Sequence, residues 1–176
     1  MKKIYFLLAI VFLVQFVEAQ TDKWKAKTSN TTATFYDIDF YSASFGIAVG
    51  HDGTNSVIRK TEDGGDTWTD LGSSDINHLL LGVSIIDENT AFVVGENGGV
   101  YKYTGSSGSW QNINIGSNVH LTDVSFPTET FGYICSKGGR FFKSTNSGVG
   151  WLTNTIYTQD DFMKVQFFTS QRGVIS

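Results

Sequence analysis

Thr61-Glu62-Asp63-Gly64-Gly65-Asp66-Thr67-Trp68 is the stretch of sequence that decides the fold, because it closes a unit that the rest of the chain repeats. The four tryptophans, Trp24, Trp68, Trp110 and Trp151, recur at intervals of 44, 42 and 41 residues. A fixed period of this length is the signature of a repeat architecture. The intervals therefore predict three complete units between the first and the last tryptophan.

Each complete unit contains four short runs rich in β-branched and aromatic residues, the composition of strands. In the second unit these runs are 81–85, 91–95, 100–103 and the segment at Trp110. Glycine turns at Asp52-Gly53, Asn97-Gly98 and Gly138-Gly139 separate the second run from the third, and such pairs supply the positive φ of tight hairpins. Four antiparallel strands at a period of about 40–45 residues are typical of a propeller blade, whereas an immunoglobulin-like sandwich would not repeat one series of turns. We predict an all-β fold, a β-propeller with about three and a half blades present.

The predicted propeller runs from residue 20 to 176, with repeats ending at Trp24, Trp68, Trp110 and Trp151 and an incomplete repeat at 162–176. Trp24–Thr28 is interpreted as the last strand of a unit whose first three strands are missing upstream. A closed ring needs about 4–8 blades. Two hypotheses follow: the chain continues beyond Ser176, which we favour, or several copies associate to cover the open blade faces.

Residues 1–19 are predicted to be a signal peptide rather than part of the fold. Lys2 and Lys3 precede an apolar run, Ile4 to Val17, and Val17-Glu18-Ala19 places small residues where a signal peptidase cleaves. The run is shorter than the roughly 20 residues that span a bilayer, which argues against a membrane anchor. We expect a secreted, periplasmic or cell-surface protein without a membrane span.

Charge and cysteine content exclude several functions. Without Lys2, Lys3 and Glu18 the chain carries 11 basic and 16 acidic side chains, and this acidic balance argues against a nucleic-acid partner. Cys135 is the single cysteine, so no intrachain disulfide can form, and its alternating strand context predicts a buried thiol. The three histidines have no ligand spacing, so we predict neither a metal nor a cofactor.

The closing stretch resembles the Asp-box of bacterial neuraminidase repeats at every defined position: Thr61, Asp63, Gly65, Thr67 and Trp68. A weaker copy is formed by Ser144, Asn146, Gly148 and Trp151, whereas only the tryptophan and a Gly/Ser-rich turn remain around Trp110. An aspartate in such a turn can accept hydrogen bonds from backbone N–H groups. The resemblance implies a structural turn between the third and fourth strands, away from the central pocket, and not a catalytic aspartate.

The wider unit is similar to the repeats of the photosystem II assembly and stability factor family, and related repeats occur in sialidases and sortilin-type receptors. The resemblance covers Trp24 to Ser176 and implies an exported, non-catalytic binding or scaffold propeller for a protein or carbohydrate ligand. That family is associated with basic residues near the repeat ends. Lys60, Lys102 and Lys143 recur there, and the alternative is a solvated edge that discourages aggregation.

Two other functions are alternatives to the scaffold. A sialidase-type glycoside hydrolase would need three arginines around the substrate, but Arg59, Arg140 and Arg172 occupy different positions of the repeat. Asp37 and Asp123 fall on first strands, which line the central channel of a propeller, and are candidate channel-lining carboxylates. A lectin-like oligomer is the second alternative if the chain is complete as given. No catalytic residue is predicted.

Overall fold

The computed structural model describes residues 25–72, 74–155 and 159–176, so the predicted signal peptide and Trp24 lie outside the described residues. The described residues contain no α-helix, only the 3₁₀ turn η1 (Glu96–Gly98) and fourteen strands. The strands are β1 (Thr34–Phe40), β2 (Gly46–His51), β3 (Ser56–Thr61), β4 (Thr69–Asp70), β5 (Leu80–Asp87), β6 (Thr90–Gly95), β7 (Val100–Thr104), β8 (Ser109–Asn112), β9 (Leu121–Ser125), β10 (Gly132–Ser136), β11 (Arg140–Ser144), β12 (Leu152–Thr155), β13 (Val165–Phe167) and β14 (Gly173–Ile175).

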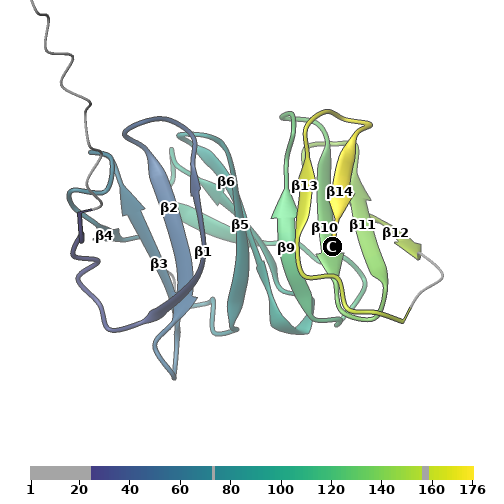
Figure 1. Cartoon of the computed structure of the whole chain (residues 1–176), viewed down its shortest axis with the longest axis horizontal. Helices are drawn as coiled ribbons and strands as arrows, with labels where there is room; N and C mark the ends of the chain where they lie inside the picture. The colour runs from purple at the N-terminus through teal and green to yellow at the C-terminus, as the bar shows by residue number, and fades with distance from the viewer. Residues whose placement is uncertain (1–24, 73, 156–158) are drawn as a thin grey trace, which may run out of the picture.

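The strands form three four-stranded sheets and one two-stranded sheet, each built from consecutive antiparallel strands. We call them blade 1 (β1–β4), blade 2 (β5–β8), blade 3 (β9–β12) and blade 4 (β13 and β14). The first strands of successive blades contact one another, which sets the sheets side by side in an arc (Figure 1). The predicted all-β fold of four-stranded propeller blades is confirmed.

One predicted strand is absent. Lys25–Thr28 has no strand conformation and pairs with no strand of the described chain. A strand needs the backbone groups of a neighbour to form its ladder, and here only side chains hold the segment, through an ion pair between Lys27 and Asp66. The fourth strands of blades 1 and 3 begin just after the tryptophan, at Thr69 and Leu152, and do not include it.

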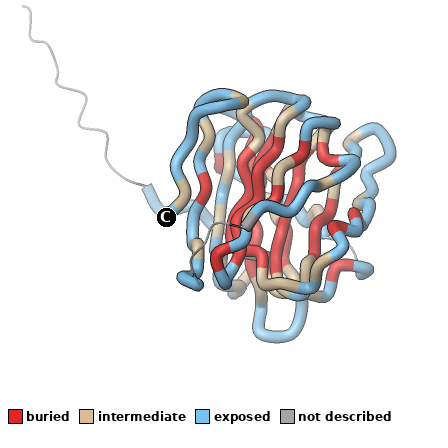
Figure 2. The backbone as a smooth tube through the Cα atoms, turned by 90° about the vertical axis from the view of Figure 1, so that its right-hand side faces the viewer, coloured by how far each residue is buried: buried red, intermediate tan, exposed pale blue. Residues whose placement is uncertain are grey.

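The core lies between the blades, in three clusters of buried residues that follow one another along the arc. The second strands contribute most to it: every residue of β10 is buried, and β2 and β6 each have five buried residues out of six. Figure 2 shows the buried residues in the middle of the molecule, with exposed loops around them. Burying each large apolar side chain contributes roughly 1.5–3 kcal/mol, so stacking of the blades supplies most of the stability.

An aromatic ring at the end of a first strand covers a glycine at the start of the second strand. A Cβ on Gly46 would come within 2.7 Å of the Phe40 ring, and a Cβ on Gly132 or Gly173 would meet Phe126 or Phe167 in the same way. Blade 2 places Ile85 opposite Ala91 instead. A smaller first-strand side chain thus allows a methyl group on its partner, which explains why these two repeat positions change together.

Candidate functional site

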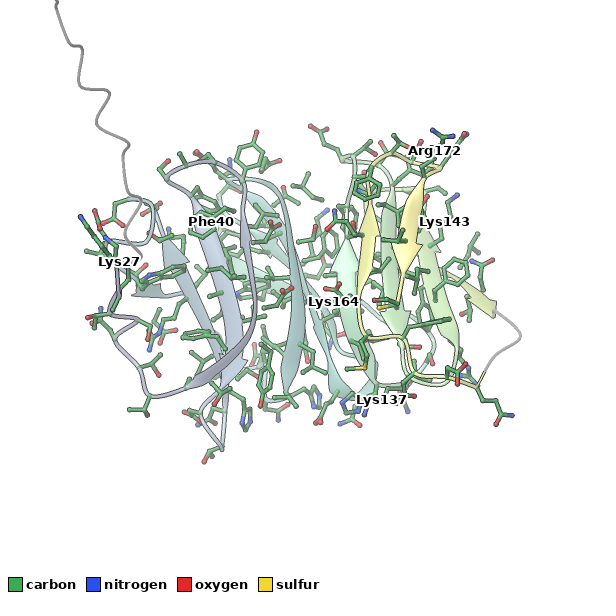
Figure 3. All side chains as sticks on the ribbon, viewed as in Figure 1. Lys27, Phe40, Lys137, Lys143, Lys164 and Arg172 are labelled. Atoms are coloured by element: carbon green, nitrogen blue, oxygen red, sulfur yellow. The ribbon has the colours of Figure 1, made fainter. Side chains whose placement is uncertain are left out.

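The first strands enclose a cleft of about 560 Å³ that faces the centre of the arc. Its walls come from β1, β5 and β9 and from residues 164–166 at the start of blade 4. Figure 3 shows the side chains of these strands, with Lys164 labelled near the middle of the molecule. The polar side chains that line the cleft are Asp37, Asp39, Ser84, Asp123, Ser125, Lys164 and Gln166. The candidate channel-lining residues Asp37 and Asp123 therefore lie in one cleft.

These polar side chains occupy two alternating positions of the repeat. The first position holds Asp37, Gly82, Asp123 and Lys164 in blades 1 to 4. The second position, two residues further on, holds Asp39, Ser84, Ser125 and Gln166. Side chains two residues apart on a strand lie on the same face, so both positions of each blade point into the cleft.

The carboxylates at the first position accept backbone hydrogen bonds from the next blade. Asp37 Oδ2 accepts from the N–H of Val83 at 2.9 Å, and Asp123 Oδ2 accepts from the N–H of Val165 at 2.9 Å. A first strand is the edge of its sheet, and its outward N–H groups need acceptors when they are buried. Each carboxylate thus satisfies the edge of the blade that follows it.

At the second position, each pair of successive blades has one more hydrogen bond from a backbone N–H to a side-chain oxygen. Asp39 Oδ2 accepts from the N–H of Ile85 at 2.7 Å. Ser84 Oγ accepts from the N–H of Phe126, and Ser125 Oγ accepts from the N–H of Phe167, both at 3.1 Å. We call this set of side-chain acceptors the inter-blade ladder: Asp37, Asp39, Ser84, Asp123 and Ser125.

Burial dominates the electrostatics of the cleft. It raises the pKa of Asp39 and of Asp123 above the ordinary value, although the backbone donors act in the opposite direction. Lys164 Nζ lies 3.0 Å from Asp37 Oδ1 and 3.4 Å from Asp123 Oδ1. Burial alone would lower the pKa of Lys164, but the charges of Asp123 and Asp37 and the hydrogen bonds to them raise it. The ammonium is therefore held in its charged form between two carboxylates.

The inter-blade ladder determines what the cleft can do. Its carboxylates are engaged by backbone donors and, for two of them, by Lys164, so they are poorly placed to transfer protons to a substrate. Exposed side chains remain at its rim, including Phe40 and Tyr41, each about half exposed, and Gln166. Such a mixed polar and aromatic rim suits contact with a polypeptide or a sugar.

The stretch that resembles the Asp-box forms a turn between β3 and β4 and does not line the cleft. Asp63 Oδ1 accepts hydrogen bonds from the Thr61 hydroxyl and the Thr67 N–H, both at 2.8 Å, and its Oδ2 accepts from the Thr67 hydroxyl at 2.6 Å. The Thr61 hydroxyl oxygen accepts from the Gly65 N–H at 2.8 Å. These bonds, chiefly those from Thr67, lower the pKa of Asp63 to about 2.

The weaker copy repeats this arrangement. Asn146 Oδ1 accepts from the Ser144 hydroxyl at 3.0 Å and from the Gly150 N–H at 2.9 Å. Ser144 Oγ accepts from the Gly148 N–H at 2.9 Å. The turn thus keeps its backbone hydrogen bonds with an amide oxygen in place of a carboxylate and without a threonine side chain before the tryptophan.

The three arginines are not brought together at the cleft, and none of them lines it. Arg59 lies on β3, 3.6 Å from Asp70, Arg140 begins β11, and Arg172 lies in the loop between β13 and β14.

Two of the three recurring lysines pack on aromatic rings, and the third pairs with a glutamate. Lys102 Nζ lies 5.6 Å from the centre of the Phe92 ring, and Lys143 Nζ lies 5.5 Å from that of Tyr133. Each lysine is the cross-strand partner of the aromatic residue beneath it, a geometry that favours cation–π contact. Lys60, opposite the aliphatic Ile47, pairs with Glu62 at 3.0 Å.

Cys135 is fully buried, as predicted, and burial raises the pKa of its thiol to about 11. Within the described ranges, no group of three His, Cys, Asp or Glu side chains is arranged to hold a metal ion. No helix in the described part of the chain is long and apolar enough to cross a membrane.

The sequence did not reveal five of the polar side chains that line the cleft: Asp39, Ser84, Ser125, Lys164 and Gln166. The first three are short acceptors at one repeat position, 42 to 46 residues before the donors that they bind. That recurrence is the signal that could have found them. Lys164 stands out because it replaces an acidic or small residue at the first position.

An arc of antiparallel blades whose first strands line a shared cleft defines this chain as a β-propeller repeat protein. A family model described as photosynthesis system II assembly factor YCF48 matches residues 16–98. Residues 16–98 are thus similar to the repeats of that family, the resemblance that the sequence predicted.

Known proteins extend this likeness beyond the matched residues. The photosystem II assembly lipoprotein Ycf48 of Synechococcus sp. (strain CC9902) is 23% identical over 145 residues, covering 76% of this chain and 40% of that protein. A solved structure of YCF48 bound to D1 peptide is 23% identical, with a TM-score of 0.65 over 79% of this chain and 45% of that one. The GH74 enzyme of Niastella koreensis is 19% identical, with a TM-score of 0.59 over 75% of this chain and 25% of that one. This chain therefore spans less than half the length of each of these proteins.

Proposed function

We propose that this chain is part of an exported, non-catalytic scaffold propeller that binds a polypeptide partner at the rim of the cleft. The observation that carries the proposal is the inter-blade ladder, because it commits the carboxylates of the cleft to holding blades together. Exposed side chains at the rim are left for contact with a partner. A similar propeller bound to a peptide, and a relative named an assembly lipoprotein, support a polypeptide as the partner class.

Export is part of this proposal and rests on residues 1–19. Their basic start, apolar run and small residues before Gln20 are those of a cleaved signal. A lipoprotein among the relatives is consistent with a location outside the cytoplasm. The turns at Thr61–Trp68 and Ser144–Trp151 take the structural role of Asp-boxes in this proposal, through the hydrogen bonds described above.

Glycoside hydrolysis is the alternative that the GH74 likeness raises, and at 19% identity that likeness concerns the fold alone. A hydrolase of this kind needs two carboxyl groups free to act as acid and as base or nucleophile. In this cleft Asp37 and Asp123 instead share the ammonium of Lys164. A lectin-like oligomer stays the third candidate.

The test is a binding experiment on the secreted form of the chain. A library of fluorescent, unstructured peptides, a glycan array and chromogenic sialoside and xyloglucan substrates are presented to the same protein. We expect saturable binding of a subset of peptides, no glycan binding above background and no hydrolysis. Tyr41 lines the cleft and Tyr36 does not, and both are about half exposed, so Tyr41→Ala should weaken peptide binding while the control Tyr36→Ala should not. Hydrolysis, or equal effects of both variants, would contradict the proposal.

A further inference from the structure

Lys164 differs from its counterparts in the other blades. The first position of the repeat holds a carboxylate in blades 1 and 3 and a glycine in blade 2, but an ammonium in blade 4. A carboxylate there accepts an N–H group of the next blade, which an ammonium cannot do. Lys164 therefore cannot extend the inter-blade ladder, and its side chain serves another purpose.

The partners of Lys164 come from two different blades. Asp123 belongs to blade 3, which precedes it, whereas Asp37 belongs to blade 1, 127 residues earlier in the chain. Both carboxylates use Oδ2 for a backbone N–H of the neighbouring blade and Oδ1 for Lys164. The side chain thus joins blades 1 and 4, the first and last blades of the described arc.

The burial of the two carboxylates favours a persistent ion pair. The side chains of Asp123 and Asp37 are 8% and 19% exposed, and that of Lys164 is 54% exposed. An isolated surface ion pair contributes little, but buried carboxylates need a counter-charge because removing them from water is costly. Lys164 supplies that charge from the solvent side of the cleft.

Gly82 leaves the room that this arrangement needs. A Cβ at Gly82 would lie 3.0 Å from Asp123 Oδ1, the oxygen that holds Lys164, and 2.8 Å from Asp123 Cα. An aspartate here, as in blades 1 and 3, would therefore crowd Asp123 and bring a third carboxylate to the same place. The missing side chain in blade 2 and the lysine in blade 4 are parts of one arrangement.

We propose that Lys164, Asp37 and Asp123 form a clasp across the cleft that fixes how far apart blades 1 and 4 stand. Among the described strands, the most extensive contacts between blades join successive blades, so the clasp adds a direct link between blades 1 and 4. The clasp is independent of the ligand class proposed above, because it acts on the shape of the arc whether or not a partner binds.

Distance measurement between blades 1 and 4 tests the clasp. Ala43 and Gln171 are exposed and lie in the loops that join the first two strands of their blades, so Ala43→Cys and Gln171→Cys can carry spin labels. Cys135 is fully buried, and labelling of the unmodified protein checks that it stays unlabelled. Pulsed electron–electron double resonance then gives the distribution of distances between the two spin labels.

We expect a narrow distribution for the labelled protein, a broadened and shifted one for Lys164→Met, and a narrow one again for Lys164→Arg. Gln166→Met changes the other exposed cleft residue of blade 4 and should leave the distribution narrow. Salt at about 1 M, where the screening length is roughly 3 Å, should broaden the distribution of the unsubstituted chain. If Lys164→Met fails to fold, Asp37→Asn removes one charge and keeps an acceptor for the Val83 N–H. An unchanged distribution in a folded Lys164→Met or Asp37→Asn protein would overturn the clasp.

Discussion

The turns between the third and fourth strands of blades 1 and 3 have matching hydrogen bonds but different surroundings. In blade 3, Trp151 packs against Phe126 of its own blade and Phe92 of the preceding one, with ring centres 5.8 and 6.4 Å apart. In blade 1, Trp68 has the corresponding contact with Phe40, at 6.3 Å, and beside it lies an apolar pocket of about 330 Å³. The turn is therefore a local structure, whereas part of the packing around Trp151 comes from the preceding blade.

First-strand residues show the same contrast. Val83, Val124 and Val165 occupy one repeat position in blades 2 to 4 and are 4%, 4% and 2% exposed. Ile38 occupies that position in blade 1 and is 53% exposed. Each blade thus buries the inner face of the next, and local sequence alone does not bury it.

Removing the Phe92 ring, which blade 2 packs against blade 3, should have the largest effect on stability. Phe92 is fully buried and stacks on Phe126 at 4.4 Å, so Phe92→Ala should lower the free energy of unfolding by about 3–5 kcal/mol. Phe40→Ala should cost clearly less, because Phe40 is 42% exposed. Urea unfolding followed by tryptophan fluorescence measures both. Equal losses would mean that blade 1 is buried in solution as deeply as blade 3.

The glycines of the two turns separate local from inter-blade effects. Gly65 and Gly148 both have positive φ, +89° and +74°, and an alanine there costs roughly 1–2 kcal/mol from backbone strain alone. A Cβ on Gly148 would also collide with Phe92, whereas the nearest atom to a Cβ on Gly65 is 3.6 Å away, on Trp68. Gly148→Ala should therefore destabilise about twice as much as Gly65→Ala in thermal unfolding. The reverse order of destabilisation would show that Phe92 of the preceding blade does not pack tightly against the turn at Gly148.

The buried hydroxyl of each turn should matter equally in both blades. Thr61 and Ser144 are both buried, and each accepts the N–H of a buried glycine. Thr61→Val and Ser144→Ala leave that N–H without its acceptor and should each cost about 1–3 kcal/mol in urea unfolding. Thr61→Ser and Ser144→Thr keep the hydroxyl and serve as controls. A loss confined to one blade would contradict a self-contained turn.

Much of the fold could be predicted because its determinants are local in sequence. The tryptophan period, the glycine turns and the alternating strands each depend on a few neighbouring residues, and they gave the blades correctly. Lys25–Thr28 was predicted wrongly, because a strand-like composition does not supply a partner strand. Period and pattern specify a blade but not its neighbours.

The cleft was predicted only in part for the same reason. Asp37 and Asp123 were placed on first strands, but their bonds to Val83 and Val165 depend on how blades stack. The contact of Lys164 with Asp37 spans 127 residues, or three repeat periods, so it joins blades that are not neighbours in the sequence. Its existence depends on the curvature of the whole arc, which no local pattern encodes.

Acid titration should give the smallest difference between the two turns. The hydrogen bonds from Thr67 and Thr61 lower the pKa of Asp63 to about 2 from an ordinary 3.8, whereas Asn146 does not titrate. A lowered carboxyl pKa stabilises the fold above pH 3.8, and this contribution is lost as the pH falls from 3.8 through about 2. Asp63→Asn keeps an acceptor oxygen, as the turn of blade 3 does. It should therefore lower the melting temperature at pH 7, where the carboxylate is charged, and change it little near pH 2, which reduces the fall between pH 4 and pH 2.

The pKa of Asp123 is shifted in the opposite direction, so its effect on stability should have the opposite pH dependence. Burial raises its pKa, so its effect favours the folded state below pH 3.8 and is lost as the pH rises through the raised value. With Asp123→Asn, the stability should therefore fall less as the pH rises above 3.8. With Asp63→Asn, it should fall less as the pH drops below 3.8. Melting temperatures recorded from pH 2 to pH 7 for both variants decide the matter. Shifts of the same sign would mean that the outer turn and the inner cleft hold their carboxylates in the same way, contrary to their burial and their hydrogen bonds.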